Sequence, residues 1–103
     1  MFGRQVTMKL KSDAASEFIR LNQTVVNAIL REQHGFLSET IHMNPERSSV
    51  VVNSLWNSQA DEANYDKTGY LQTLKLLADV VEGTPMVKTF ELAIPSFHLA
   101  AAA

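Results

Sequence analysis

Residues 36–61 read FLSETIHMNPERSSVVVNSLWNSQAD, and this stretch decides the fold. Its first eight residues alternate in side-chain character, which predicts a β-strand over 36–43. The next segment, 44–49, is rich in Asn, Pro and Ser, so we expect it to form a hairpin loop. Residues 50–56 predict the second strand of this hairpin. Both faces of that strand are partly apolar, which favours a position in the middle of a sheet.

A helix is predicted directly after this hairpin. Ser58 and Asp61 match the Ser-x-x-acid capping pattern, in which the serine hydroxyl accepts a backbone N–H of the first turn. The segment 66–69 interrupts the apolar periodicity, and glycine inside a helix costs about 1 kcal/mol relative to alanine. We therefore expect two helical pieces joined by a kink or a short loop, with the pattern ending at Gly83.

Two more alternating segments predict the first and the last strand of the chain. Residues 4–11 place Val6, Met8 and Leu10 on one side, and residues 86–94 alternate in the same way until Pro95. Each segment is therefore expected to pack one face against a core.

A further amphipathic helix is predicted between the first strand and the hairpin. Apolar residues recur at spacings of three and four from Phe18 to Ile29, with Ser12 and Asp13 as the expected N-cap and Gly35 as the expected stop. The element order is then βαββαβ. This order predicts an α+β ferredoxin-like fold with a four-stranded antiparallel sheet and both helices on one face. We expect one domain over 1–95 and a short tail over 96–103.

The composition narrows the possible functions. The 103 residues carry nine Lys and Arg against eleven Asp and Glu, a formal net charge of −2, which offers no electrostatic attraction to nucleic acid. No apolar run reaches the roughly 18 residues of a membrane span, so we expect no membrane partner and a cytoplasmic location. The chain contains no cysteine, which excludes disulfides, iron–sulfur clusters and thiolate zinc sites.

One face of the predicted sheet is left uncovered, because two helices can cover only one side of four strands. We expect a homodimer in which two such faces meet, since a solvated face should be more polar than this one. A monomer with a modest apolar patch is the alternative. Apolar Ile94, Phe97 and Leu99 are expected to reach the partner copy. The uncovered face is predicted to carry Phe36, Val51, Leu55, Val87 and Ala93, interleaved with Thr7, Thr40, Asn53 and Thr89.

Established catalytic motifs are missing from the sequence. It contains no Gly-rich phosphate loop, no Gly-x-Ser-x-Gly and no His-Glu-x-x-His. His34, His42 and His98 fall in different elements and lack the spacing of metal ligands, so we expect no metal and no other cofactor.

Aromatic side chains are the remaining candidates for a site. Trp56 ends the central strand, and Tyr65 and Tyr70 lie on the interrupted second helix. Indole and phenol rings suit a pocket for a flat organic ligand, which would measure about 300 Å³ or more. They are also common fillers of a small core, and spacing alone leaves both interpretations open.

The motifs of residues 34–38 (HGFLS) and 50–58 (VVVNSLWNS) resemble the antibiotic biosynthesis monooxygenase family, in which Gly-Phe-Leu opens a strand and a valine-rich strand ends in Trp-x-Ser. The resemblance implies a dimeric α/β barrel with a ligand cavity between sheet and helices in each protomer. Some members oxidise polycyclic phenols to quinones with O2 and without metal or flavin, and others degrade haem.

The sequence departs from both of these types. Quinone-forming members have an Asn four residues before the strand's Trp, where Val52 stands here; Asn53 follows one position later and is expected on the opposite face unless a bulge redirects it. Haem-degrading members have a His on the second helix, whereas residues 65–81 contain none, which disfavours haem degradation.

We therefore expect a cofactor-independent monooxygenase of this type that acts on a small aromatic, polyphenolic or quinone-like compound. Trp56, Tyr65 and Asn53 are the candidate catalytic residues, and Asn53 would polarise an oxyanion. The alternative is a non-catalytic dimeric binding protein on the same scaffold. The residues expected to contact the ligand are Trp56, Tyr65, Tyr70, Val52 and Phe18.

Overall fold

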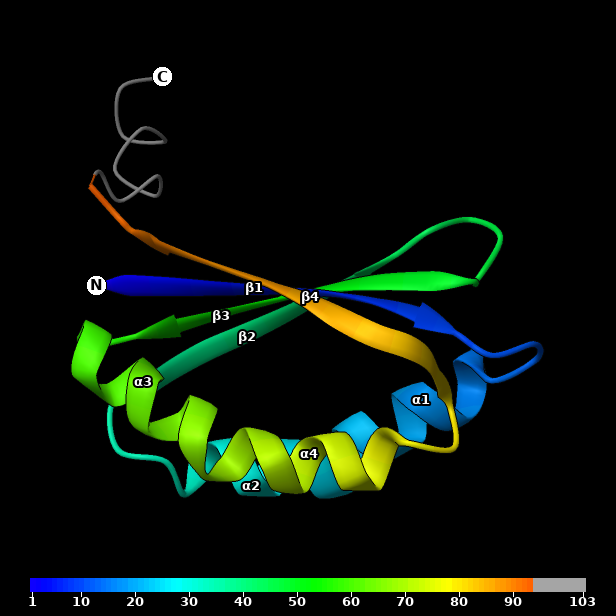
Figure 1. The fold of residues 1–103 in the computed structure, drawn as a ribbon, viewed down its shortest axis with the longest axis horizontal. Helices are drawn as coiled ribbons and strands as arrows, with labels where there is room; N and C mark the ends of the chain where they lie inside the picture. The colour runs from blue at the N-terminus through cyan, green and yellow to red at the C-terminus, as the bar shows by residue number, and fades with distance from the viewer. Residues whose placement is uncertain (94–103) are drawn as a thin grey trace.

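A computed structural model describes residues 1–93, and it confirms the α+β ferredoxin-like fold. Four antiparallel strands form one sheet in the order β2-β3-β1-β4 (Figure 1). The two strands of the hairpin thus lie at one side of the sheet, and β3 is interior as predicted. The strands are β1 (Phe2–Leu10), β2 (Phe36–Met43), β3 (Ser49–Trp56) and β4 (Val81–Glu91).

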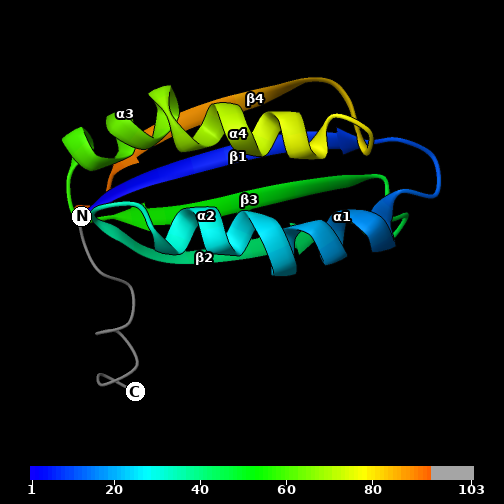
Figure 2. The same cartoon turned by 90° about the horizontal axis from the view of Figure 1, so that it is seen from below.

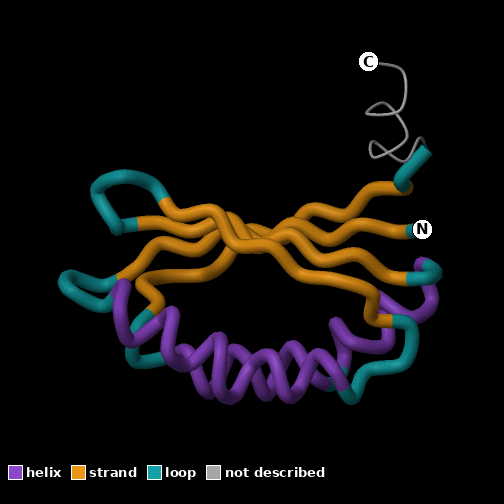
Figure 3. Tube along the Cα trace, turned by 180° about the vertical axis from the view of Figure 1, so that it is seen from behind, coloured by secondary structure: helices purple, strands orange, loops and turns teal. Residues whose placement is uncertain are grey.

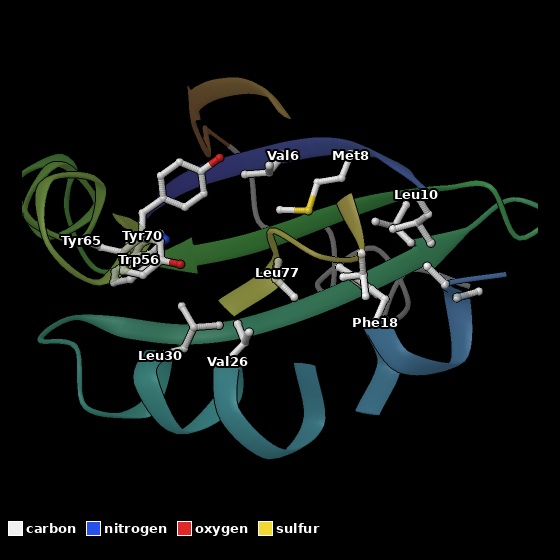
Figure 4. Packing of buried hydrophobic residues seen from close by; sticks show 14 residues of the cluster. Val6, Met8, Leu10, Phe18, Val26, Leu30, Trp56, Tyr65, Tyr70 and Leu77 are labelled. Atoms are coloured by element: carbon white, nitrogen blue, oxygen red, sulfur yellow. The ribbon is translucent and has the colours of Figure 1, made fainter. Parts of the chain in front are cut away.

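All helices of the described residues lie on one face of the sheet. The segment from α1 to α2 runs along β2 and β3, and α3 and α4 run along β1 and β4 (Figure 2). The core fills the space between these two layers (Figure 4). The helical elements are α1 (Ala15–Leu21), the π-helical segment η1 (Asn22–Val26), α2 (Asn27–Arg31), α3 (Gln59–Lys67) and α4 (Gly69–Leu77).

The first helix begins later than predicted. Ala14 occupies the N-cap position without any side-chain hydrogen bond, so the predicted cap at Ser12 and Asp13 is wrong. The backbone N–H of Ala14 donates to the carbonyl of Lys11, and Asp13 takes a φ of +59° in this turn. Gly35 is in the left-handed region, with a φ of +79°, and forms the turn into β2.

The start and the interruption of the second helical region agree with the sequence pattern, but its predicted end at Gly83 is wrong, because α4 ends at Leu77 and Gly83 lies in β4. The Ser58 hydroxyl accepts the backbone N–H of Asp61 at 3.2 Å and caps α3. The predicted interruption falls at Thr68, whose φ of −125° and ψ of −82° are not helical. Thr68 therefore separates α3 from α4 and allows their axes to differ.

Strand β4 differs from its prediction in both its start and its faces. It begins at Val81, and an irregularity of register opposite Met8 includes Gly83, with a φ of +74°. The register moves by two residues across this irregularity, from Glu82 opposite Lys9 to Met86 opposite Thr7, so the alternation of faces is kept. Phe90 pairs with Gly3 on the outer face, whereas Val87 pairs with buried Val6 on the helix side. The predicted outward positions of Val87 and of Thr89, which pairs with Arg4, are therefore wrong.

Strand β2 also contains a register shift, between Phe36 and Ser38. Phe36 consequently pairs with Trp56 and packs its ring edge-on against the indole, with centroids 5.5 Å apart. The predicted position of Phe36 on the uncovered face is wrong for this reason.

The outer face of the sheet nevertheless remains apolar. No element of residues 1–93 lies against it (Figure 3). Phe90 and Met86 are 41% and 61% exposed there, and Val51 and Leu55 alternate with the buried residues of β3. Ile94, Phe97 and Leu99, predicted to reach a partner copy, lie outside the described residues.

Two glycines with positive φ provide a matched test of the turn into β2. A Cβ on Gly35 would lie 2.1–2.7 Å from side-chain atoms of Asp61, whereas a Cβ on Gly83 would meet nothing within 4 Å. Gly83→Ala should cost about 1–2 kcal/mol, the price of a left-handed non-glycine residue. Gly35→Ala should lower the free energy of unfolding by about 2 kcal/mol or more, because the new Cβ must also displace the side chain of Asp61 in the first turn of α3. Urea denaturation measures both free energies of unfolding; equal costs would show that Asp61 does not confine this turn.

Candidate functional site

A cavity of about 30 Å³ lies between the sheet and the helices, which is room for one or two water molecules. It is far smaller than the volume expected from the sequence, so a flat aromatic ligand enters only if the helical layer moves outward. The lining residues come from β1, β2, β3 and the helical elements: Arg4, Val6, Met8, Phe18, Asn22, Val26, Leu30, Glu39, Val52, Ser54, Tyr65, Tyr70, Thr73 and Leu77.

The three aromatic residues predicted as site candidates form one contiguous cluster at one end of the core (Figure 4). Trp56 and Tyr65 are stacked with ring centroids 5.0 Å apart, and Tyr70 follows at 6.0 Å from Tyr65. Trp56 is fully buried, and its indole N–H donates to the Ser54 hydroxyl at 3.0 Å. Tyr65 and Tyr70 line the cavity. Trp56 is not among the lining residues and packs against the ring of Tyr65.

The remaining predicted residues divide by strand face. Phe18 and Val52 line the cavity. Asn53 does not, because β3 pairs with β1 in regular register and turns this side chain to the outer face. There its Oδ1 accepts a hydrogen bond from Nε2 of Gln5 at 3.1 Å. The bulge that would have redirected Asn53 toward the ligand is not present in β3.

A buried arginine, which the sequence interpretation missed, borders the cavity beside the tyrosines. Arg4 is 1% exposed, and its Nη1 donates to Oε2 of Glu62 at 2.6 Å and to Oδ1 of Asp66 at 2.8 Å. Its guanidinium carbon lies 4.2 Å from the ring centroid of Tyr70 and 5.4 Å from that of Tyr65, within cation–π range. Burial disfavours the charge, but the hydrogen bonds to the two carboxylates outweigh it and raise the pKa of Arg4.

Both phenols are neutral hydroxyl groups at physiological pH. Burial raises the pKa of Tyr65 and of Tyr70 above the ordinary value for tyrosine. The Thr73 hydroxyl donates to the carbonyl of Gly69 at 3.1 Å, so in its 3.4 Å contact with Tyr65 it is the acceptor. The Tyr65 proton is thus engaged with Thr73.

A half-buried carboxylate lines the cavity from β2. Burial raises the pKa of Glu39, and the hydrogen bond that Nδ2 of Asn22 donates to its Oε1 at 3.1 Å opposes this effect only in part. A carboxylate with a raised pKa is a better proton acceptor than an exposed one. Glu39 is therefore the group of this cavity best suited to remove a proton from a ligand.

Alternation along the strands could have revealed both missed residues. Arg4 has the same parity as Val6 and Met8, and a charged residue on the apolar face of a strand signals a buried ion pair or a site. Glu39 shares its face with Ile41 in the same way. Neither pattern identifies the partners, since Glu62 lies 58 residues from Arg4 in the sequence.

Residues 1–93 contain no group of three or more His, Asp or Glu side chains placed to hold a metal ion. No helix among them is long and apolar enough to cross a membrane.

A family comparison matches residues 1–75 to the description "Antibiotic biosynthesis monooxygenase", which is well over half of the chain. The chain belongs to the antibiotic biosynthesis monooxygenase family. A search of curated proteins finds no match. The family membership therefore rests on the matched segment, which contains β1, the hairpin and the aromatic cluster of Trp56, Tyr65 and Tyr70.

Solved structures of similar fold include several proteins described as monooxygenases. A putative antibiotic biosynthesis monooxygenase from Nitrosomonas europaea is 17% identical, with a TM-score of 0.75 over 91% of this chain and 100% of that one. SnoaB, a cofactor-independent oxygenase from Streptomyces nogalater, is 17% identical, with a TM-score of 0.75 over 91% and 94%. The ActVA-Orf6 monooxygenase of Streptomyces coelicolor, solved with nanaomycin D, is 24% identical, with a TM-score of 0.70 over 91% of each chain. At these identities the likeness shows a shared fold.

The raised pKa of Glu39 predicts a pH-dependent effect on stability. Because the folded-state pKa exceeds the unfolded one, the stability linked to Glu39 is full at acidic pH and is lost as the pH rises through the folded value. Glu39→Gln should therefore increase the free energy of unfolding at pH 7, and this gain should vanish near pH 4. Urea denaturation at the two pH values measures it, with exposed Glu46→Gln as the control. A loss of stability at pH 7 would contradict the burial argument.

Proposed function

We propose that this protein is a cofactor-independent monooxygenase that oxidises a small aromatic, polyphenolic or quinone-like compound with O2. Its membership of the monooxygenase family supports this reaction class. The single observation that carries the ligand class is the aromatic cluster at the cavity, in which Trp56 stacks on Tyr65 and Tyr70 lies tilted beside Tyr65, because aromatic rings favour contact with flat aromatic molecules.

The lining residues would divide the work of such a reaction. Tyr65, Tyr70, Val52 and Phe18 would contact the flat ligand, while Trp56 holds Tyr65 in place. Glu39 would accept the proton whose loss makes the bound ring electron-rich enough to reduce O2. In the oxidation of an anthrone-type CH2 group to a carbonyl, one oxygen atom enters the product and the other leaves as water.

Ligand entry requires the cavity to widen from about 30 Å³. The two cavity tyrosines lie on either side of the break at Thr68, so a change in the angle between α3 and α4 would move Tyr70 away from the sheet while the ion pairs of Arg4 hold α3 in place. Movement at such an interruption leaves the hydrogen bonds within each helix intact.

An anthrone-type phenol is the direct test of this activity. The wild-type protein should consume O2 faster than the spontaneous oxidation in buffer, with quinone formation followed by absorbance. Val52→Phe should remove at least about nine-tenths of this rate, because the larger side chain occupies the ligand volume. Val87→Phe, the same substitution on β4 away from the cavity lining, should leave the rate unchanged.

Two outcomes would contradict the oxygenase. Binding of the phenol without O2 consumption would make the protein a binding module on this scaffold. Equal rates in wild type and Val52→Phe, with both folded by circular dichroism, would separate any activity from the cavity.

The working unit is proposed to be a homodimer formed through the outer face of the sheet, the arrangement that the family resemblance implies. A second copy would cover an apolar surface on this face. The surface is formed by the exposed side chains of Met86 and Phe90 together with Val51 and Leu55. The pairing of β4 with β1 supports this proposal, since it places these two large apolar side chains of β4 on the outer face.

Phe90→Glu should convert a dimer of the wild type into a monomer, because it places a charge in the apolar contact. Leu71→Glu on α4 is the matched control, since Leu71 is 53% exposed on the helical side and should leave the dimer intact. Sedimentation velocity at micromolar concentration measures both. A monomeric wild type would contradict the proposed interface.

A further inference from the structure

Arg4 is the one fully buried charged side chain that lines the cavity within residues 1–93. It comes from the inner face of β1, between the paired strands β3 and β4. Because its backbone belongs to the centre of the sheet, the guanidinium is held on a rigid element. Groups fixed on strands are more precise ligand-binding elements than groups on loops.

Only one of its three guanidinium nitrogens has a hydrogen-bond partner. Nη1 serves both carboxylates, whereas Nε and Nη2 are buried and meet no acceptor among the described residues. Buried donors of a native protein are nearly always satisfied by protein, water or ligand. The two nitrogens therefore require an acceptor that enters the cavity.

The surroundings of these donors suit a flat molecule. The guanidinium plane is bordered by the ring of Tyr70 at 4.2 Å and by that of Tyr65 at 5.4 Å. An oxygen held by Nε and Nη2 would thus belong to a ligand that lies against the two rings.

The charges around Arg4 determine which kind of oxygen fits. Its single positive charge already faces the two carboxylates of Glu62 and Asp66, so this cluster carries a net charge of −1. Glu39 adds a third carboxylate to the same cavity. A ligand carboxylate would bring further negative charge into a site of low dielectric, which is costly without a free counter-charge.

We propose that Nε and Nη2 of Arg4 bind a neutral carbonyl oxygen of a flat aromatic ligand, a quinone or aryl ketone, and that Glu62 and Asp66 make the site reject aromatic carboxylates. The inference rests on the proposed function only in placing the ligand in this cavity. Two adjacent N–H donors can hold one carbonyl oxygen through both of its lone pairs. Arg4 is thus the residue that selects ketone over acid.

A matched pair of probes tests this selectivity without any turnover. 2-Acetylnaphthalene and 2-naphthoate share one ring system and differ in presenting a ketone or a carboxylate. Isothermal titration calorimetry at pH 7.5 should show a dissociation constant for the ketone that is lower by about tenfold or more. Because no O2 is consumed, this result is independent of the oxygen-uptake assay.

Two variants assign the preference to the charge cluster. Asp66→Asn removes one negative charge from a half-exposed position and should tighten binding of 2-naphthoate by about tenfold, with little change for the ketone. Asp79→Asn, an exposed position after α4, is the control and should change neither constant. Arg4→Lys keeps the charge but loses the paired donors, and should weaken ketone binding by about tenfold or more.

The proposal is wrong if 2-naphthoate binds as tightly as the ketone, if neither probe binds at millimolar concentration, or if Asp66→Asn leaves the ratio of the two constants unchanged. Equal ketone binding by wild type and a folded Arg4→Lys would show that water satisfies Nε and Nη2. Oxygen consumption by a protein that fails these binding tests would uphold the proposed function and reject the role of Arg4 alone.

Discussion

The buried guanidinium of Arg4 is the constraint on which the site end of the molecule depends. A charge in the core is tolerated only when partners compensate for its lost hydration, and both of its carboxylate partners come from α3. The ion pairs therefore fix α3 over β1. With α3 in this position, Tyr65 stacks on Trp56 and Tyr70 comes to lie beside the guanidinium. One charged residue on a strand thus sets the orientation of the aromatic wall.

The opposite face of the sheet is not covered by any element of residues 1–93 (Figure 3). The pairing of β4 with β1 determines what this edge of the face carries. Met86 pairs with Thr7 and Phe90 pairs with Gly3, so both side chains face outward, where they are 61% and 41% exposed. The alternation of one edge strand therefore places Val87 on the side of the core and Met86 and Phe90 on the uncovered face.

Sequence patterns predicted the elements that local chemistry controls. Period-two alternation, the Ser58 cap and the break near Gly69 all depend on neighbours in the chain, and the structure confirms each of them. Two errors arise where pairing partners decide. Phe36 faces inward because of a register shift that only the pairing with β3 reveals, and the alternation of β4 does not by itself tell which of its faces, that of Val87 or that of Phe90, is the inner one. For the site, the aromatic residues were predictable from type and spacing. The alternation placed Arg4 and Glu39 on apolar faces of their strands, but their roles depend on contacts between distant segments of the chain.

Departures from regular structure converge on the cavity, and this convergence is itself an argument for function. Asn22 and Val26, the ends of the π-helical segment, line it, and Tyr65 and Tyr70 flank the non-helical Thr68. The unsatisfied nitrogens of Arg4 add a further cost, since each unpaired buried donor costs about 1–3 kcal/mol. A core selected for stability alone would have replaced such features with apolar packing. Their collection around one small space is what a binding site requires, because a bound ligand recovers the cost that the empty site incurs.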